Sequence, residues 1–544
     1  MQSIQNLKVI IVGAGEVGMN VAMKLGKHDE IEITLIEADE SRSALMQASL
    51  DCNHVQGSGL DPENLRLAGI YECDLFYALT DADEVNLLAC QLAKEMVSRH
   101  LSERLNDHDD EELGDHLDDS LNDEVLSPCP PLGEQGRQKY SEAHSASERL
   151  YLYARVRSES LYEHVQMLFP SINAIFPERA CSRKLDELFH YQQVFDVVEL
   201  ESNRLKLYGL KIHPNSQVVG QSLKDFTSDH QLTIAAIARK SENTRFQARV
   251  LQIPWAEYEM QAHDEIYLAT TPKTLHLIHD IFASQDENDR LSSIAIAGET
   301  SVALNVFFRL VSRSNRRLEN EGNEVNAEGT RKAISLITGD EKVAEKVEQS
   351  DFRGQATVVS GSLTDIAKLA ELGVGPKSTL LISGSDEDNL ICALLARELG
   401  CERILIVNNR EQYAELIDHL GFDGIFSPRQ LAVNEMVHQS LKHLSKSAFD
   451  IASSEDIEVR SFVVDPGSAL CGLALKDLTT VGFPRKFAVI AALKDPDDEL
   501  HRMPTGQDIL QAGSVAYIVA KSADFHNINS IFGRRRSRFR LWRS

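Results

Sequence analysis

The sequence predicts an α/β protein in which two parallel-sheet domains alternate with two small α+β domains. The first observation is a repeat: KVIIVGAGEVG at residues 8–18 returns as SIAIAGETSVA at residues 293–303. The second is a later repeat, because residues 214–225 match residues 466–477 within β-rich stretches. Internal repeats decide the architecture before any single motif does. We therefore expect the domain order A–B–A′–B′.

The elements of the first copy follow from the spacing of its apolar residues. Short apolar runs alternate with amphipathic segments, which is typical of a parallel sheet with helices on both faces. The predicted strands cover residues 7–12, 31–37, 55–57, 74–79 and a run that starts at Leu150, and the predicted helices cover residues 18–27, 62–68 and 84–97.

An acidic stretch interrupts this pattern. Residues 103–124 contain eleven Asp or Glu and one Arg, whereas the same gap in the second copy is three residues long. Such a composition cannot bury a core, so we predict a disordered insertion at about residues 99–148. A docking site for a basic partner is the alternative.

These patterns divide the chain into four domains and a tail. We predict a first nucleotide-binding-like domain at 1–190, a small domain at 195–285, a second nucleotide-binding-like domain at 290–442, a second small domain at 447–533 and a basic tail at 534–544. We expect linkers at 286–290 and 445–456 and a mobile loop at 316–331. The six-arginine tail either lies on an anionic membrane or pairs with the protein's own acidic surface.

Composition narrows the function classes. A net charge of −27 argues against nucleic acid as a partner, because phosphates would be repelled. No apolar run approaches the roughly 18 residues that cross a bilayer, and the start of the chain does not resemble a signal peptide. Eight scattered cysteines suit reduced thiols. We therefore expect a soluble, cytoplasmic protein that reaches membranes through a partner.

The first copy holds a complete Gly-x-Gly-x-x-Gly turn of the Rossmann type. Gly13 allows the tight turn, Gly15 lets backbone amides approach a diphosphate, and Gly18 lets the following helix pack close to the sheet. The helix N-terminus then offers N–H groups and a partial positive charge to phosphates. Glu37 ends the second strand, where a carboxylate accepts hydrogen bonds from both ribose hydroxyls. This favours NAD(H) or an unphosphorylated adenosine over NADP.

Further polar residues lie where the ligands of such sheets bind. Thr80 and Asp81 end the fourth strand, and Arg155 ends the strand after the insertion, within reach of a phosphate. No constellation of His, Asp, Lys or Cys accompanies them as catalysis would require. We therefore expect a protein that senses a nucleotide and is no enzyme. A soluble NAD-dependent oxidoreductase is the first alternative, and a degenerate scaffold that only oligomerises is the second.

The second copy has lost parts of this motif. Thr300 and Ala303 replace two glycines, and Thr338 stands where the acid would be. We expect weak or absent dinucleotide binding there. A different nucleotide remains open as an alternative, since Gly298 and Asp365 are kept.

The motifs assembled here resemble those of the TrkA family of bacterial Trk potassium uptake systems and of the wider group of RCK domains. The resemblance covers nearly the whole chain in the order RCK-N, RCK-C, RCK-N, RCK-C. Its most specific segments are Gly13–Gly18, Gln56–Gly59, Ala78–Asp81, Asp83–Gln91 and Ala154–Arg157.

The resemblance implies both a site and partners. It implies NAD(H) as ligand, with ATP or ADP competing at related sites, and a homo-oligomeric ring at the cytoplasmic face of the inner membrane. There the ring would regulate a TrkH- or TrkG-like potassium transporter subunit. The contacts it implies are Gly13, Ala14, Gly15, Glu16, Val17, Gly18, Glu37, Thr80, Asp81 and Arg155.

Overall fold

We obtained the fold from a computed structural model of the chain. It describes residues 7–28, 30–112, 150–201, 204–229, 232–240, 249–255, 257–286, 291–320, 333–348, 356–410, 413, 416–417, 419–443, 447–450, 457–484, 487–496 and 501–532. The acidic stretch from residue 113 to 149 and the arginine tail therefore lie outside the described residues, as do the predictions made for them.

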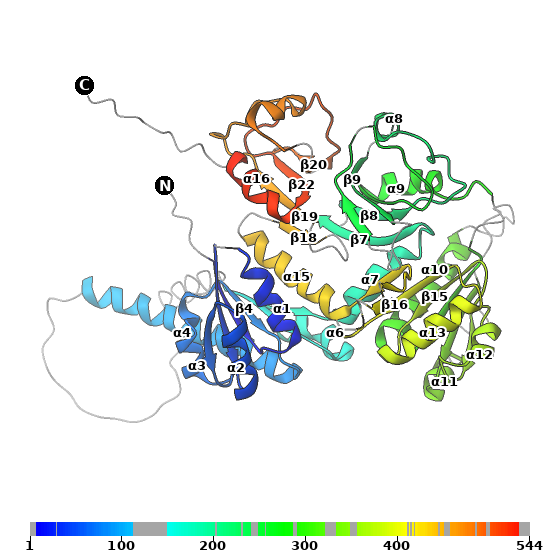
Figure 1. Ribbon diagram of the computed structural model, residues 1–544. Helices are drawn as coiled ribbons and strands as arrows, with labels where there is room; N and C mark the ends of the chain where they lie inside the picture. The colour runs from blue at the N-terminus through cyan, green and yellow to red at the C-terminus, as the bar shows by residue number, and fades with distance from the viewer. Residues whose placement is uncertain are drawn as a thin grey trace, which may run out of the picture. The chain divides into compact units, whose positions relative to one another are not determined.

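The first half of the chain forms a six-stranded parallel sheet (Figure 1), with the strand order β3-β2-β1-β4-β5-β6. Its strands are β1 (Leu7–Val12), β2 (Ile31–Glu37), β3 (Asn53–Gln56), β4 (Leu75–Ala78), β5 (Tyr151–Arg155) and β6 (Ile172–Ile175). Its inner strands are apolar on both faces because helices cover both. The predicted α/β fold class is confirmed here.

Helices connect these strands and cover the two faces. They are α1 (Glu16–Leu25), α2 (Glu40–Ser49), α3 (Pro62–Leu67), the 3₁₀ turn η1 (Ile70–Glu72), α4 (Asp83–Glu112) and α6 (Glu159–Leu168). A further helix, α7 (Pro177–Leu188), follows β6. Ile10 and Phe76 share one buried cluster with residues of α3 and α4. Ile11 lies on the opposite face, which α1 covers.

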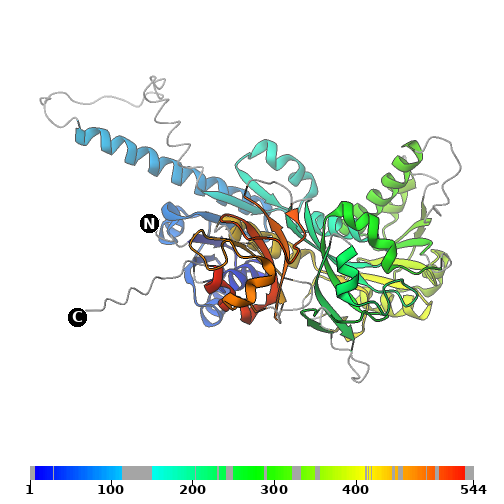
Figure 2. The ribbon, with the colours of Figure 1, turned by 90° about the horizontal axis from the view of Figure 1, so that it is seen from above.

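Helix α4 is longer than the sequence suggested. It continues from the predicted end at Val97 to Glu112, so the first part of the predicted disordered insertion is helical. Residues 98–112 contain neither Gly nor Pro and are rich in Glu, Leu and Arg, which favour helix without a buried face. Figure 2 shows this part of α4 projecting beyond the sheet.

The second half repeats the same topology, with the strand order β14-β13-β12-β15-β16-β17. The strands are β12 (Ser293–Ala297), β13 (Ala333–Thr338), β14 (Thr357–Ser360), β15 (Ser378–Ile382), β16 (Arg403–Val407) and β17 (Gly424–Phe426). The helices are α10 (Ser301–Asn320), α11 (Glu341–Glu348), α12 (Ile366–Glu371), α13 (Asp386–Glu398) and α15 (Pro428–His443). Helix α10 includes the start of the predicted loop at 316–331, and residues 321–332 lie outside the described part.

Each parallel sheet is followed in the chain by a small antiparallel sheet. The first comprises β7 (Val194–Glu201), β8 (Leu205–Lys211), β9 (Thr233–Lys240), β10 (Arg249–Gln252) and β11 (Glu265–Thr270), with α8 (Leu223–Asp229), α9 (Pro272–Ile278) and η2 (His279–Phe282). The second comprises β18 (Ser447–Asp450), β19 (Ile457–Val463), β20 (Ala488–Lys494), β21 (His501–Arg502) and β22 (Val515–Lys521), with η4 (Leu475–Val481), η5 (Ser522–Asp524) and α16 (Phe525–Phe532). Apolar residues of both sheets form one buried cluster.

One predicted linker contains a strand. Residues 447–450 of the expected linker 445–456 form β18, which pairs antiparallel with β19, with Phe449 in register with Val459. Residues 451–456 and 287–290 lie outside the described part of the chain.

Contacts divide the chain into two compact units that do not follow the chain order. One unit comprises residues 1–177 and 435–440, and the other comprises residues 178–434 and 441–544. Helix α7, which we placed in the first domain, thus packs against the second parallel sheet, where Leu185 and Leu381 share one cluster. The middle of α15 packs instead with the first sheet.

Candidate functional site

The glycine turn after β1 has the geometry that the motif predicts. Gly13 has φ +96°, a conformation that L side chains rarely adopt, and a Cβ there would lie 3.0 Å from the Thr80 nitrogen. A Cβ on Gly18 would lie 2.0 Å from the Gly13 carbonyl oxygen and 3.6 Å from Ile11. Both glycines are therefore required by the protein's own packing, which brings the start of α1 onto the sheet.

Gly15 differs from both because nothing in the fold requires it. It has φ −66°, and an added Cβ would meet nothing within 4 Å. It is also the N-cap residue of α1 and provides no side-chain hydrogen bond to that helix end. The N-terminus of α1 thus faces open space, as a phosphate site built from backbone amides requires.

Glu37 ties the turn to the end of β2. Its side chain is 8% exposed. Oε2 accepts a hydrogen bond from the Ala14 N–H at 2.6 Å, and Oε1 accepts one from the Asp39 N–H at 2.8 Å. A carboxylate has about four acceptor positions, so two remain for hydroxyls of a ligand. Sequence reasoning predicted the position but not these two backbone bonds.

Asn86 fixes the next loop, and it was not among the predicted site residues. It is fully buried, and its side-chain oxygen accepts hydrogen bonds from Thr80 N–H and Oγ1 at 2.9 and 2.7 Å. Its amide donates to the carbonyls of Thr80 and Arg155 at 3.0 and 2.9 Å. This one side chain joins the ends of β4 and β5. The signal for it was the repeated Asp-Glu-x-Asn at residues 83–86 and 386–389.

Asp81 and Arg155 meet above those strand ends. The Arg155 guanidinium lies 3.3 Å from the Asp81 carboxylate, with side-chain exposures of 9% and 71%. Arg157 also donates to the Asp81 carbonyl at 3.2 Å. The basic group is therefore held in a buried position while its acidic partner stays in solvent.

The predicted residues form a continuous row along the carboxyl edge of β2, β1, β4 and β5. Glu37 contacts Ala14, Gly13 approaches Thr80, and Asp81 pairs with Arg155. Two predicted residues contribute differently: Val17 is 2% exposed and packs in the core, whereas Glu16 is exposed in the first turn of α1. Only the backbone of Val17 is available to a ligand.

At the corresponding edge of the second sheet, side-chain hydroxyls of the protein occupy the hydrogen-bonding positions. The Thr300 hydroxyl accepts a hydrogen bond from the Ala303 N–H at 3.3 Å and pairs with the Ser383 hydroxyl at 2.5 Å. Thr338 accepts from the Asp340 N–H at 3.1 Å but is too short to reach the turn. Asn389 donates to the Val407 carbonyl as Asn86 does to that of Arg155, so Val407 stands in place of the arginine.

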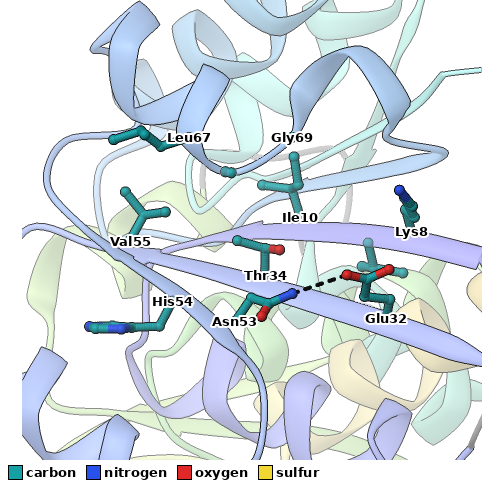
Figure 3. Close-up of a pocket in the computed structure, with 11 residues that line it drawn as sticks. Lys8, Ile10, Glu32, Thr34, Asn53, His54, Val55, Leu67 and Gly69 are labelled. Carbon is teal, nitrogen blue, oxygen red and sulfur yellow. Dashed lines mark hydrogen bonds between the residues drawn. The ribbon is translucent and has the colours of Figure 1, made fainter.

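A pocket of about 370 Å³ lies elsewhere on the first sheet (Figure 3). Lys8, Glu32 and Asn53 line it near the starts of β1, β2 and β3, and the Asn53 amide donates to Glu32 at 3.1 Å. Because the glycine turn and Glu37 follow the opposite ends of these strands, the pocket is separate from the row of predicted residues.

Among the described residues, no group of three or more His, Cys, Asp or Glu side chains is arranged to hold a metal ion. Among the helices described, none combines the length and apolarity needed to cross a bilayer.

Comparison with known sequences gives matches along the whole chain. The chain is 23% identical over 529 residues to the Trk system potassium uptake protein TrkA homolog 2 of Methanosarcina mazei, which covers 97% of this chain and 100% of that protein. It is 23% identical over 479 residues to the Trk system potassium uptake protein TrkA of Haemophilus influenzae, which covers 84% and 86% of the two chains.

Solved structures share the fold. The crystal structure of the GsuK RCK domain superposes with a TM-score of 0.50 at 14% identity, covering 98% of this chain and 96% of that one. The GsuK channel bound to NAD gives a TM-score of 0.50 at 15% identity and covers 98% and 80%.

Family models match three segments of the sequence. The TrkA-N domain matches residues 9–128 and 322–428, and the TrkA-C domain matches residues 459–533. Together these segments make up more than half of the chain, which therefore belongs to the family of proteins built from TrkA-N and TrkA-C domains.

Proposed function

We propose that the protein is a regulatory subunit that binds NAD(H) at its first parallel sheet and adjusts the activity of a membrane potassium transporter. The nucleotide acts as a signal, because its binding favours one conformation of the chain over another. The single observation that carries this proposal is the open N-terminus of α1 at Gly15, with Glu37 beside it.

The chemistry of this row suits an adenine dinucleotide. The amides at the start of α1 would hold the diphosphate, and the Glu37 carboxylate would accept bonds from the ribose hydroxyls. Arg155 would add a positive charge at the phosphate end of the row, in competition with Asp81. The same carboxylate would repel the 2′-phosphate of NADP. ATP or ADP would compete through the same diphosphate contacts.

The link to potassium rests on the relatives. Proteins named as Trk potassium uptake components match 84% or more of the chain, and the NAD-bound GsuK channel shares its fold. We propose that several copies form a ring against a TrkH- or TrkG-like transporter at the cytoplasmic face of the membrane.

Nucleotide binding is tested by calorimetry on the full-length chain with NADH, NADPH and ADP. We expect NADH and ADP to bind and NADPH to bind at least tenfold more weakly, since removing the acceptor bonds and adding repulsion costs about 1.4 kcal/mol or more. Absence of NADH binding would overturn the proposal. Steady consumption of NADH with added metabolites would instead favour the oxidoreductase.

The regulatory role is tested by potassium uptake in cells that lack this chain. We expect the wild-type chain to restore uptake and a Gly15→Thr variant to restore only the part that is independent of nucleotide. Equal uptake with and without the chain would contradict a role in potassium transport.

A further inference from the structure

A buried phenol lies on the strand that leads to the proposed site. Tyr77 is in β4, three residues before Thr80, and is fully buried. It pairs in register with Ile11, so both side chains lie on the sheet face that α1 covers. Tyr77 also stacks on Tyr153 of β5, with ring centroids 4.8 Å apart. Tyr77 therefore lies on β4, which ends at the proposed site, and on the sheet face that is covered by α1.

The Tyr77 hydroxyl is bonded to α15. It donates to the Met436 carbonyl at 2.9 Å and lies 2.6 Å from the Ser440 hydroxyl, which itself donates to Met436 at 3.0 Å. Burial raises the pKa of the Tyr77 phenol well above its ordinary value, so it remains protonated and able to donate. The Tyr77 hydroxyl, the Ser440 hydroxyl and the Met436 carbonyl thus bond to one another within an apolar environment.

The positions equivalent to Tyr77 and Tyr153 in the second half are apolar. There Leu381 occupies the register position of Tyr77 and Leu405 that of Tyr153. Both share one buried cluster with Leu185 and Phe189 at the end of α7. At these two register positions the second sheet therefore presents apolar side chains to its helix, whereas the first sheet presents two phenol rings, and the Tyr77 hydroxyl bonds to α15.

Helix α7 is also fixed by a buried cation. The Arg403 guanidinium donates to the Leu188 carbonyl at 3.3 Å, and burial lowers its pKa to about 10. The corresponding position in the first sheet is Tyr151, which is 41% exposed. The helix at the degenerate copy thus receives a buried cation from the neighbouring strand, whereas α15 at the intact copy receives hydrogen bonds from the Tyr77 hydroxyl.

Directional bonds respond to displacement more sharply than apolar contacts do, because a hydrogen bond weakens steeply as its angle opens. Helix α15 continues in the chain into β18 and the second antiparallel sheet. A ligand-dependent shift of the β4 end would therefore reach that sheet through Tyr77 and Ser440.

We infer that Tyr77 is a positioning residue that couples nucleotide binding at the first site to the packing of α15, through its bonds to Met436 and Ser440. This inference rests on the proposed function, since it names how the same site passes on its state. Tyr77 itself does not touch the ligand.

The test is hydrogen–deuterium exchange of the full-length chain with and without saturating NADH, followed in peptides from residues 428–443. In the wild type we expect NADH to change exchange in α15 roughly fivefold or more, the usual range of a coupling free energy. In Tyr77→Phe we expect that change to disappear while NADH affinity stays within about twofold, as for distant sites. Tyr153→Phe is the matched control, since it removes a stacked phenol on the same face and should keep the response.

Each result of the exchange experiment either supports or contradicts the coupling role of Tyr77. If Tyr77→Phe raises α15 exchange equally with and without NADH and keeps the NADH-dependent change, the residue is only structural and the inference is wrong. If the wild type binds NADH without any change in α15, the inference fails alone. If the wild type does not bind NADH, the proposed function fails with it. If Tyr77→Phe does not fold, the same exchange measurement is made on Ser440→Ala. This variant removes the Ser440 hydroxyl and its bonds to Tyr77 and Met436, while the bond from Tyr77 to the Met436 carbonyl remains.

Discussion

The two parallel sheets of this chain have the same topology, but the N-terminus of the first helix is uncapped in one and capped by a side chain in the other. In the first, Gly15 leaves the N-terminus of α1 without a side-chain cap and with open space beside it. In the second, Thr300 caps α10 with its own hydroxyl and bonds to Ser383. One copy leaves its helix end without a side-chain cap, and the other satisfies the Ala303 amide with its own side chain.

The comparison indicates that replacing a motif glycine by a capping residue, as in the second copy, can stabilise the end of the helix. Helix ends expose amides that must find partners, and a threonine cap stabilises a helix by about 1 kcal/mol. Thr338 and Val407 complete the change, since neither provides the charge of Glu37 or Arg155. The predictions below exchange these features between the copies.

The largest effect is expected from Gly15→Thr, which copies the cap of the second site into the first. The threonine side chain would stand where a diphosphate approaches and accept from one of the amides itself, costing one charge-assisted bond or about 2–3 kcal/mol. We expect roughly a hundredfold increase in the NADH Kd by calorimetry.

The same variant should not harm the fold. An added Cβ meets nothing within 4 Å, and threonine is at least as good a cap as glycine, so we expect an unchanged or slightly higher Tm. A fall in Tm together with the lost binding would mean that Gly15 serves the fold and not the ligand.

Gly18→Ala is expected to act through stability. Its Cβ would lie 2.0 Å from the Gly13 carbonyl, so α1 must move away from the sheet, at a cost of about 1–3 kcal/mol. Ala303 occupies the matching position in the second copy, where its side chain is fully buried. Urea unfolding of the full-length chain would measure the loss, with Ala303→Gly as the matched reverse change. An unchanged midpoint for Gly18→Ala would show that the turn relaxes freely.

Sequence reasoning reached features that depend on local pattern. The two parallel sheets with helices on both faces and the turn roles of Gly13 and Gly18 follow from apolar spacing and from the glycine turn, and the structure agrees. It could not reach contacts between distant segments. Tyr77 meets Ser440 across 363 residues, and α7 packs with the second sheet, because apolar helices look alike in sequence whichever sheet they cover.

At the site, too, positions set by local spacing could be predicted, whereas bonds between distant segments could not. The position of Glu37 follows from the spacing after Gly18, but its bonds to Ala14 and Asp39 depend on how the turn folds back over β2. Asn86 was overlooked because a buried amide between two strand ends has no signature within one copy. The end of α4 was misjudged because charge density was taken as a sign of disorder, although those residues also favour helix.

Glu37→Thr should have a smaller effect than Gly15→Thr, together with a change in preference. Threonine keeps the bond to Asp39, as Thr338 keeps the one to Asp340, and releases Ala14. Loss of the ribose acceptor costs about 1.5 kcal/mol, so NADH should bind roughly tenfold more weakly. Repulsion of the 2′-phosphate also disappears, so the ratio of NADPH to NADH affinity should rise. An unchanged ratio in competition titrations would contradict the assignment of this carboxylate.

The smallest effect is expected from Thr300→Gly, which removes the cap of the second copy. Glycine in place of the threonine cap costs only a few tenths of a kcal/mol, and the loss of the bond to Ser383 adds about 1 kcal/mol. Nucleotide binding should not appear, because Thr338 and Val407 still provide no acceptor and no cation. Calorimetry of Thr300→Gly in a Gly15→Thr background isolates the second site. Binding there would show that the cap alone separates the two copies, and the charges of Glu37 and Arg155 would then be secondary to an open helix end.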